Sequence, residues 1–184
     1  MRTLKTQQKL TFADLPVEEQ RAAHYAYLES VMPELVGRLA WSRAQIEAYQ
    51  TQVFRDLLRH VKAHSPWHAN RVAHLDPDTA TPADIVSLPT MDKNGLMDNW
   101  DAIVAVPGAS RLAAEEALRA NSDQFYIWGD NVLLASGGSG GRPGLFLYDW
   151  FGMAMLWGGM GRGFFSSLAA LAKKGVAVPA GVRM

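Results

Sequence analysis

The sequence contains no cysteine among its 184 residues. This absence excludes disulfides, thiol nucleophiles and zinc sites with cysteine ligands, and it gives no indication of an oxidising compartment. The chain also lacks an excess of charge of either sign, because Lys+Arg and Asp+Glu both number 18. Without a basic run we expect no nucleic-acid partner. No apolar run typical of a signal peptide follows the first residues, so we expect a cytoplasmic protein.

Apolar residues make up 48% of the chain, which argues against disorder and predicts one domain of ordinary size. Two helices are expected in its first third. The first begins at Pro16 and is stopped by Pro33. The second begins at Ser42, which forms a capping box with Gln45, and it ends near Ser65.

Three histidines at intervals of four residues, His60, His64 and His68, raise the question of a metal site, because histidines at i and i+4 can share one ion. Pro66 breaks the helix between the second and third histidine, and no nearby acid completes a ligand shell. We therefore favour ordinary histidines at a helix end, where the helix dipole suits them, and expect no metal site.

The middle of the chain predicts several short elements between turns. The residue preferences and caps indicate a helix from Thr81 to Leu88, a helix from Met91 to Trp100, a strand at Ala102–Val106, a helix at Ser110–Arg119, and a hairpin of Phe125–Trp128 with Val132–Ala135. Lys93 could reach a phosphate, but a solvated lysine is favoured.

A glycine-rich stretch stands between two apolar runs, Val132–Ala135 and Leu145–Tyr148. Its residues are Ser136, Gly137, Gly138, Ser139, Gly140, Gly141, Arg142 and Pro143. Glycines allow the backbone to turn its N–H groups inward, and two hydroxyls and one guanidinium add donors for anionic oxygens. The pattern predicts a strand, a phosphate-binding loop and a second strand. A plain hairpin connection is the alternative.

Spacing excludes two common phosphate motifs. A P-loop requires a Gly-Lys-Ser/Thr sequence, but Gly141 is followed by Arg142 and Pro143. The dinucleotide fingerprint fails as well, because Pro143 stands where its third glycine belongs.

The stretch resembles the ATP loop of the adenylate-forming enzymes, which usually reads Ser-Ser-Gly-Thr-Thr-Gly-Lys-Pro. Ser136, Gly138, Gly141 and Pro143 keep the pattern, Ser139 replaces a Thr, and Arg142 replaces the Lys. Two positions depart from it, because Gly137 stands for the second Ser and Gly140 for the second Thr. In addition, Gly144 stands at the position after the Pro, where the family often has a basic residue.

The preceding segment resembles the phenylacetate-CoA ligase-like branch of this superfamily. The order of its parts is Leu57–Val61, then Ser65–His68, then Leu88–Lys93, then the loop. The resemblance implies an α/β fold, with N-terminal helices and the first strands of a mixed sheet around the phosphate loop. It assigns residues 1–41 to a helical extension and 42–184 to a partial N-terminal ATP-binding domain.

The same resemblance implies a ligase that uses ATP and Mg²⁺ to convert a carboxylic acid to its acyl-adenylate and transfers the acyl group to CoA. Loop residues 136–143 would hold the phosphates. The family's adenine, ribose and CoA contacts and its late catalytic Lys have no counterpart in this sequence, so catalytic residues stay unassigned and we expect the isolated chain to be inactive. A stand-alone binding or interaction module is the alternative function.

After the loop, Asp149 is expected to cap a helix from Trp150 to about Leu171, in which Arg162 is the only charge. Its length would span a bilayer, and Gly159 and Gly163 match a membrane packing motif. The central Arg162 costs about 2.5–3.5 kcal/mol on insertion scales, so we favour a buried helix over a membrane span. Its apolar circumference predicts self-association through residues 150–171 when it is uncovered.

Overall fold

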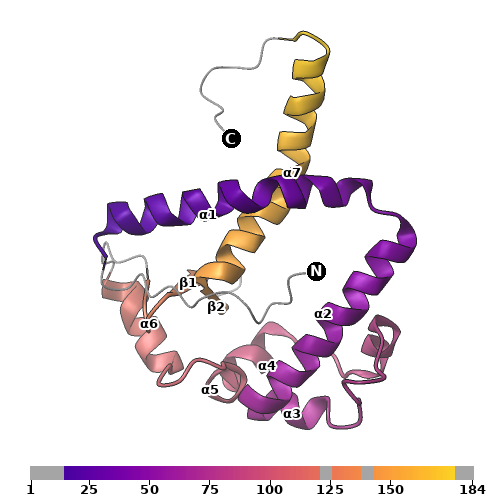
Figure 1. Cartoon of the computed structure of the whole chain (residues 1–184). Coiled ribbons are helices and arrows are strands. Elements are labelled where there is room, and N and C mark those ends of the chain that lie inside the picture. Colours follow the sequence, from indigo (N-terminus) through magenta and orange to yellow (C-terminus); the bar gives the residue numbers. More distant parts are fainter. Residues whose placement is uncertain (1–14, 121–125, 138–142, 177–184) are drawn as a thin grey trace. The chain divides into compact units, whose positions relative to one another are not determined.

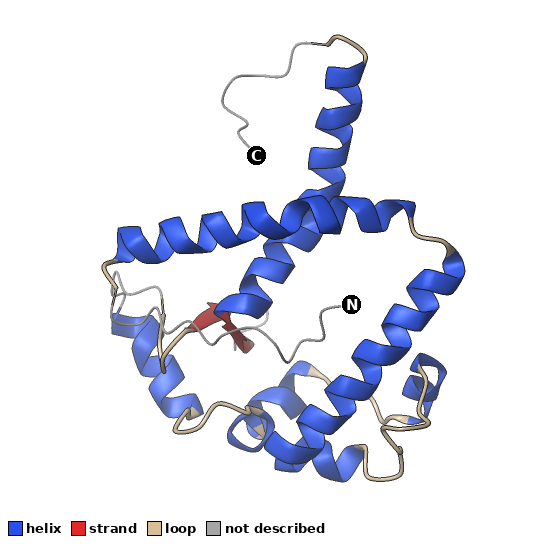
Figure 2. Cartoon of the chain, in the orientation of Figure 1, coloured by secondary structure: helices blue, strands red, loops and turns tan. Residues whose placement is uncertain are grey.

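The computed structural model describes residues 15–120, 126–137 and 143–176. Helices predominate and accompany one small sheet (Figures 1 and 2). In chain order the elements are α1 (Val17–Gly37), η2 (Arg38–Ala40), α2 (Arg43–His64), α3 (Pro66–Arg71), η3 (Pro82–Ser87), α4 (Lys93–Asp98), α5 (Trp100–Ile103), α6 (Arg111–Ala120), β1 (Asn131–Ala135), β2 (Leu145–Asp149) and α7 (Trp150–Lys173). The two strands pair antiparallel, so the described chain is a helix-rich mixed α/β structure.

The described residues divide into two compact units. The first unit contains α1 as far as Val36, residues 126–133, and residues 148–176 with α7. The second contains residues 37–120, 134–137 and 143–147, with helices η2 to α6. Each unit has buried apolar residues of its own.

In the first unit, α1 crosses α7 at close range (Figure 1). A Cβ atom added to Gly158 would lie 2.5 Å from Leu35 Cδ1 and 3.2 Å from Leu28 Cδ1. Nearer the start of α7, the ring of Trp150 packs edge-on against Tyr27 with a centroid distance of 4.7 Å. The absence of a side chain at Gly158 is therefore what allows the two helices to approach.

The expectation that Pro33 ends the first helix is wrong, because α1 continues to Gly37 with Pro33 inside it. Proline has no N–H to donate and normally costs a helix one hydrogen bond. Met32 and Leu35 are both buried on either side of it. Their burial against the first unit stabilises the last turn beyond the proline.

The second unit is built on α2. Ser42 and Gln45 form the expected capping box, in which the Gln45 N–H donates to Ser42 Oγ at 3.3 Å and the Ser42 N–H donates to Gln45 Oε1 at 2.9 Å. One side of α2 buries Leu58 in an apolar cluster. Its other members are Val72, Leu75 and Ala80, with Phe54, Val61 and Leu88 packed around them.

The expected strand at Ala102–Val106 is wrong. Ala102 and Ile103 belong to α5, and their N–H groups both donate to the Asn99 carbonyl at 3.0 Å. The Ser65 hydroxyl shares its hydrogen between two carbonyls of α5, with Oγ 2.8 Å from the Ile103 oxygen and 3.3 Å from the Ala102 oxygen. These bonds hold the backbone in a helical turn despite its β-forming side chains, a case of tertiary contacts overriding propensity.

The remaining expectations are confirmed in most respects. Thr81 and Asp84 form a capping box at the start of η3, α6 lies where a helix was expected, and Asp149 caps α7 through a 2.6 Å bond from the Gly152 N–H. The helix expected at Met91–Trp100 is two shorter helices, α4 and α5. Of the expected hairpin, one bridge between Ile127 and Asn131 is present, and Phe125 lies outside the described residues.

Within the ranges that the structure describes, no helix combines the length and the apolarity needed to cross a membrane.

A buried polar pair joins α1 to the segment before β1. His24 Nδ1 and Tyr126 Oη lie 2.8 Å apart, and the ring of Trp150 stands edge-on to His24. Burial lowers the pKa of His24 below its ordinary value of 6.5, partly offset by the Trp150 carbonyl. Burial and the nearby Asp130 raise the pKa of Tyr126 to about 12. The pair is therefore neutral at physiological pH.

The helix crossing predicts opposite effects for two neighbouring glycines. Gly158→Ala and Gly159→Ala each gain about 1 kcal/mol of helix propensity. Only Gly158 meets other atoms, since nothing lies within 4 Å of a Cβ at Gly159. We expect overpacking to make the Gly158 variant about 1–3 kcal/mol less stable than the Gly159 variant in chemical denaturation. Equal stability of the two variants would contradict the close crossing.

The buried histidine predicts a loss of stability in acid. The unfolded chain binds a proton at His24 near pH 6.5, whereas the folded chain resists it until a lower pH. The contribution of neutral His24 to the free energy of unfolding should therefore be fully present above about pH 6.5 and should be lost as the pH falls below that value. The free energy of unfolding, measured by chemical denaturation at about pH 7.5 and about pH 5.5, should differ less between the two pH values for His24→Gln than for the unaltered chain. His64→Gln, at an exposed position, should keep the full difference.

Candidate functional site

The two strands expected on either side of the glycine-rich stretch are confirmed, and they pair with each other as β1 and β2. The Ser136 N–H donates to the Gly144 carbonyl at 2.9 Å, and the Gly144 N–H donates back to Ser136 Oγ at 2.8 Å. These two bonds close the loop directly beyond the ends of β1 and β2. Ser136 is half-buried, whereas Gly137 and Pro143 are exposed. The central residues Gly138, Ser139, Gly140, Gly141 and Arg142 lie outside the described residues.

The hydroxyl of Ser136 has a structural role that sequence reasoning did not foresee. Its oxygen accepts the Gly144 N–H and so holds the base of the loop. The same hydroxyl retains its own hydrogen, because a serine can donate one bond while it accepts others. Ser136 can therefore close the loop and still donate to an anionic oxygen.

A side chain at Gly144 would crowd this closure. A Cβ atom there would lie 3.1 Å from the ring of Phe146 and 3.3 Å from Ser136 Oγ. Gly144 is buried, so the neighbouring atoms have little room to move. The lack of a side chain at Gly144 therefore permits the closure of the loop.

The first residue of β2 is held by two buried side chains from the preceding helices. The indole N–H of Trp100 donates to the Leu145 carbonyl at 3.1 Å, and the Leu145 N–H donates to Met97 Sδ at 3.4 Å. Trp100 and Met97 are each 1% exposed. Both backbone groups of Leu145 are thus satisfied by α4 and α5, and the C-terminal base of the loop is fixed to the second unit.

Sequence reasoning did not single out Trp100 or Met97 as part of the site. The available signal was the indole itself, because a buried tryptophan usually finds an acceptor for its N–H. The identity of that acceptor could not be read from the sequence, since Leu145 lies 45 residues away.

Contacts also join the other segments of the sequence pattern. The guanidinium of Arg71 stacks over Trp67 at 4.1 Å and donates to the carbonyls of Pro89 and Thr90. Ser65 Oγ is bonded to α5, whose Trp100 reaches the loop base. The Ser65–His68 turn, the Leu88–Lys93 segment and the base of the loop therefore belong to one continuous set of contacts.

Lys93 begins α4 and is exposed. It precedes Met97 by four residues, so both stand on the same side of this helix. The N-terminus of α4 is capped by Asp92, whose Oδ1 accepts the Gly95 N–H at 2.7 Å.

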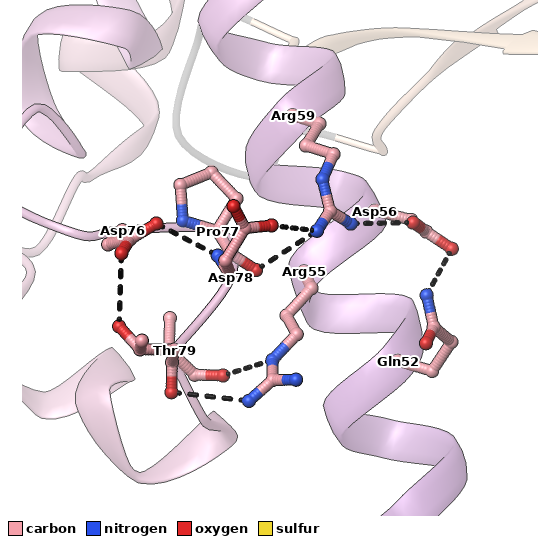
Figure 3. A network of polar contacts seen from close by, with 9 residues as sticks. Gln52, Arg55, Asp56, Arg59, Asp76, Pro77, Asp78 and Thr79 are labelled. Atoms are coloured by element: carbon pink, nitrogen blue, oxygen red, sulfur yellow. Dashed lines mark hydrogen bonds and ion pairs between the residues drawn. The ribbon is translucent and has the colours of Figure 1, made fainter.

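Three basic residues in the second half of α2 hold the loop before η3, and Figure 3 shows two of them, Arg55 and Arg59. Arg55 donates to the carbonyls of Ala80 and Thr79, and Arg59 reaches Asp78 at 2.6 Å and Asp56 at 3.0 Å. Lys62 donates to the Leu75 carbonyl at 2.5 Å. These cations are directed at backbone carbonyls and carboxylates, so they hold the fold rather than present a site for anions.

The helix is broken between His64 and His68, as the sequence indicated, so His60 and His64 lie on α2 and His68 lies on α3. Pro66 begins α3 directly after α2 ends, and the rings of His60 and His64 lie 4.7 Å apart. Burial and the neighbouring Arg71 lower the pKa of His68. The described part of the chain contains no group of three His, Cys, Asp or Glu residues that could hold a metal ion.

Comparisons of this chain with protein-family models, curated proteins and solved structures gave no match.

The closure of the loop predicts a local effect of removing one hydroxyl. Ser136→Ala should lower the free energy of unfolding by about 1 kcal/mol, the usual value for one hydrogen bond, and speed hydrogen exchange at the Gly144 amide. The matched control is Ser167→Ala, which removes an exposed hydroxyl bonded within α7. If Gly144 exchange is the same in both variants, the proposed closure is wrong.

Proposed function

We propose that the loop between β1 and β2 binds the phosphates of ATP with Mg²⁺, in a chain that represents the N-terminal part of an acyl- or aryl-CoA ligase. The observation that carries this proposal is the fixed base of the loop. A flexible hairpin turn does not require four bonds at its ends, whereas a phosphate loop gains affinity when its ends are held before the ligand arrives.

The donor set of the stretch suits a polyphosphate. Residues 136–143 contain no carboxylate that would repel it, and they offer two hydroxyls, one guanidinium and the N–H groups of residues 137–142. The Ser136 N–H is already bonded to the Gly144 carbonyl, and Pro143 has no N–H. Mg²⁺ commonly binds through substrate phosphates and one or two protein oxygens. Ser139 is the residue that the resemblance assigns to orienting a phosphate or this ion.

In this proposal a carboxylic acid attacks the α-phosphate of ATP, pyrophosphate leaves, and CoA then displaces AMP to give a thioester. The residues of the loop act on the leaving group. Backbone donors and Arg142 would hold the β- and γ-phosphates and stabilise the charge that develops on pyrophosphate. Their contribution is positional and electrostatic, and no covalent bond to the protein is formed.

Arg142 keeps the positive charge of the family's lysine but presents it with a different geometry. A guanidinium presents a planar fork of donors that can bind two phosphate oxygens at once, whereas an ammonium acts as a compact point charge. With Gly140 in place of a threonine, one hydroxyl is absent, so binding should depend more strongly on Arg142.

A second candidate function is a binding or interaction module in which the loop has no ligand. The exposed apolar side chains of α7, which are Trp157, Met160, Phe164 and Leu171, favour it. Binding of Mg-ATP by the purified chain distinguishes the two candidates.

Titration calorimetry with Mg-ATP tests the assignment of Arg142. Loss of one hydrogen bond to a charged group costs about 1.5–3 kcal/mol, so Arg142→Ala should weaken ATP binding roughly ten- to hundredfold. Arg142→Lys should recover part of the affinity. Arg119→Ala, which removes an exposed arginine paired with Glu115 on α6, should bind like the unaltered chain.

AMP provides the matched ligand, because it lacks the β- and γ-phosphates. Its affinity should be lower than that of ATP and should not respond to Arg142→Ala. Absence of ATP binding by the unaltered chain, or an equal loss for ATP and AMP, would contradict the proposed role of the loop.

A further inference from the structure

The outer part of α7, which here means the segment from Trp157 to Lys173, carries an exposed apolar stripe. Trp157, Phe164 and Leu171 follow one another at intervals of seven residues, which is two helical turns, and Met160 lies on the same side. These four side chains are 53%, 54%, 42% and 61% exposed, respectively. The helix lies against α1 through Gly158, and the stripe is on a different side from this contact. We refer to these four residues as the α7 stripe.

The charges of this region all have the same sign. Between residues 150 and 176 the sequence contains Arg162, Lys173 and Lys174 but no Asp or Glu. Because the whole chain is formally neutral, the preceding residues carry an excess of acid. By the period of the helix, Arg162 and Lys173 stand opposite the α7 stripe. The outer part of α7 is therefore an amphipathic helix with aromatic residues on one side and cations on the other.

We propose that the outer part of α7 binds the surface of a membrane that contains anionic lipids. A helix with Trp, Phe and Leu on one face and Lys or Arg on the other lies in the plane of the lipid headgroups, with its apolar face below them. The anionic headgroups attract the cations on the opposite face of the helix, because the long Lys and Arg side chains extend to the level of the headgroups. The helix lies on the bilayer and does not span it.

The charges of α7 disfavour a second copy of the chain as the occupant. A second copy of this helix would bring further cations and no carboxylate to the contact. Charge complementarity favours an anionic lipid surface.

Vesicle co-sedimentation tests this proposal with two lipid compositions. The purified chain should bind vesicles made of equal parts phosphatidylcholine and phosphatidylserine, and it should bind pure phosphatidylcholine at least tenfold more weakly. High salt should reduce binding to the anionic vesicles, because it screens the attraction. Equal binding to both compositions, or no binding to either, would overturn the proposal.

Three variants identify the surface that binds. Trp157→Ser combined with Phe164→Ser removes the largest apolar side chains of the stripe, and Lys173→Gln combined with Lys174→Gln removes two cations. Each pair should weaken binding about tenfold or more. Val86→Ser is the matched control, since Val86 is 88% exposed in η3 of the second unit, and it should not alter binding. Circular dichroism verifies that each variant keeps its helices.

Sedimentation velocity without lipid provides the opposing outcome. If the chain forms dimers that the Trp157→Ser and Phe164→Ser substitutions dissociate, and it does not bind anionic vesicles, the α7 stripe is a contact between copies and the lipid proposal is wrong. The outcome is independent of ATP binding, because the stripe and the loop residues do not overlap.

Discussion

The second unit depends on how the backbone of Leu145 is held. Its carbonyl accepts the indole N–H of Trp100, and its N–H donates to Met97 Sδ, with both side chains almost fully buried. A buried backbone group without a partner costs free energy comparable to a lost hydrogen bond. The two side chains remove this cost where β2 begins, and they connect the sheet to α4 and α5 across 45 residues of sequence.

This anchoring separates the loop into a fixed base and the residues that would contact a ligand. Ser136 and Gly144 close the base through two bonds, and the lack of a side chain at Gly144 permits their approach. The Ser65–His68 turn is connected to this base through Ser65 Oγ and α5. A phosphate-binding function would make physical use of this rigidity, because a preordered loop loses less entropy when it binds.

Local sequence signals predicted the helix caps and the two strands β1 and β2, but they also predicted a strand at Ala102–Val106 that is absent. Ser42 and Asp149 were found because a cap joins a side chain to an N–H group a few residues away. Pro33 was misjudged because the burial of α1 on α7 outweighs the missing bond, and burial depends on distant residues. The bond from Trp100 to Leu145 was not foreseen for the same reason. Composition and periodicity identify a side chain that needs a partner, but they do not say which partner it finds.

The most direct test of the proposed function is hydrogen exchange of the purified chain with and without Mg-ATP. We predict slower exchange across residues 136–144 when the nucleotide is present, with little change in α1 and α7. This pattern would follow if the loop N–H groups donate to phosphate oxygens while the base is already held. Exchange that is unchanged across residues 136–144, or slowed only in α1 and α7, would contradict a phosphate-binding role for the loop.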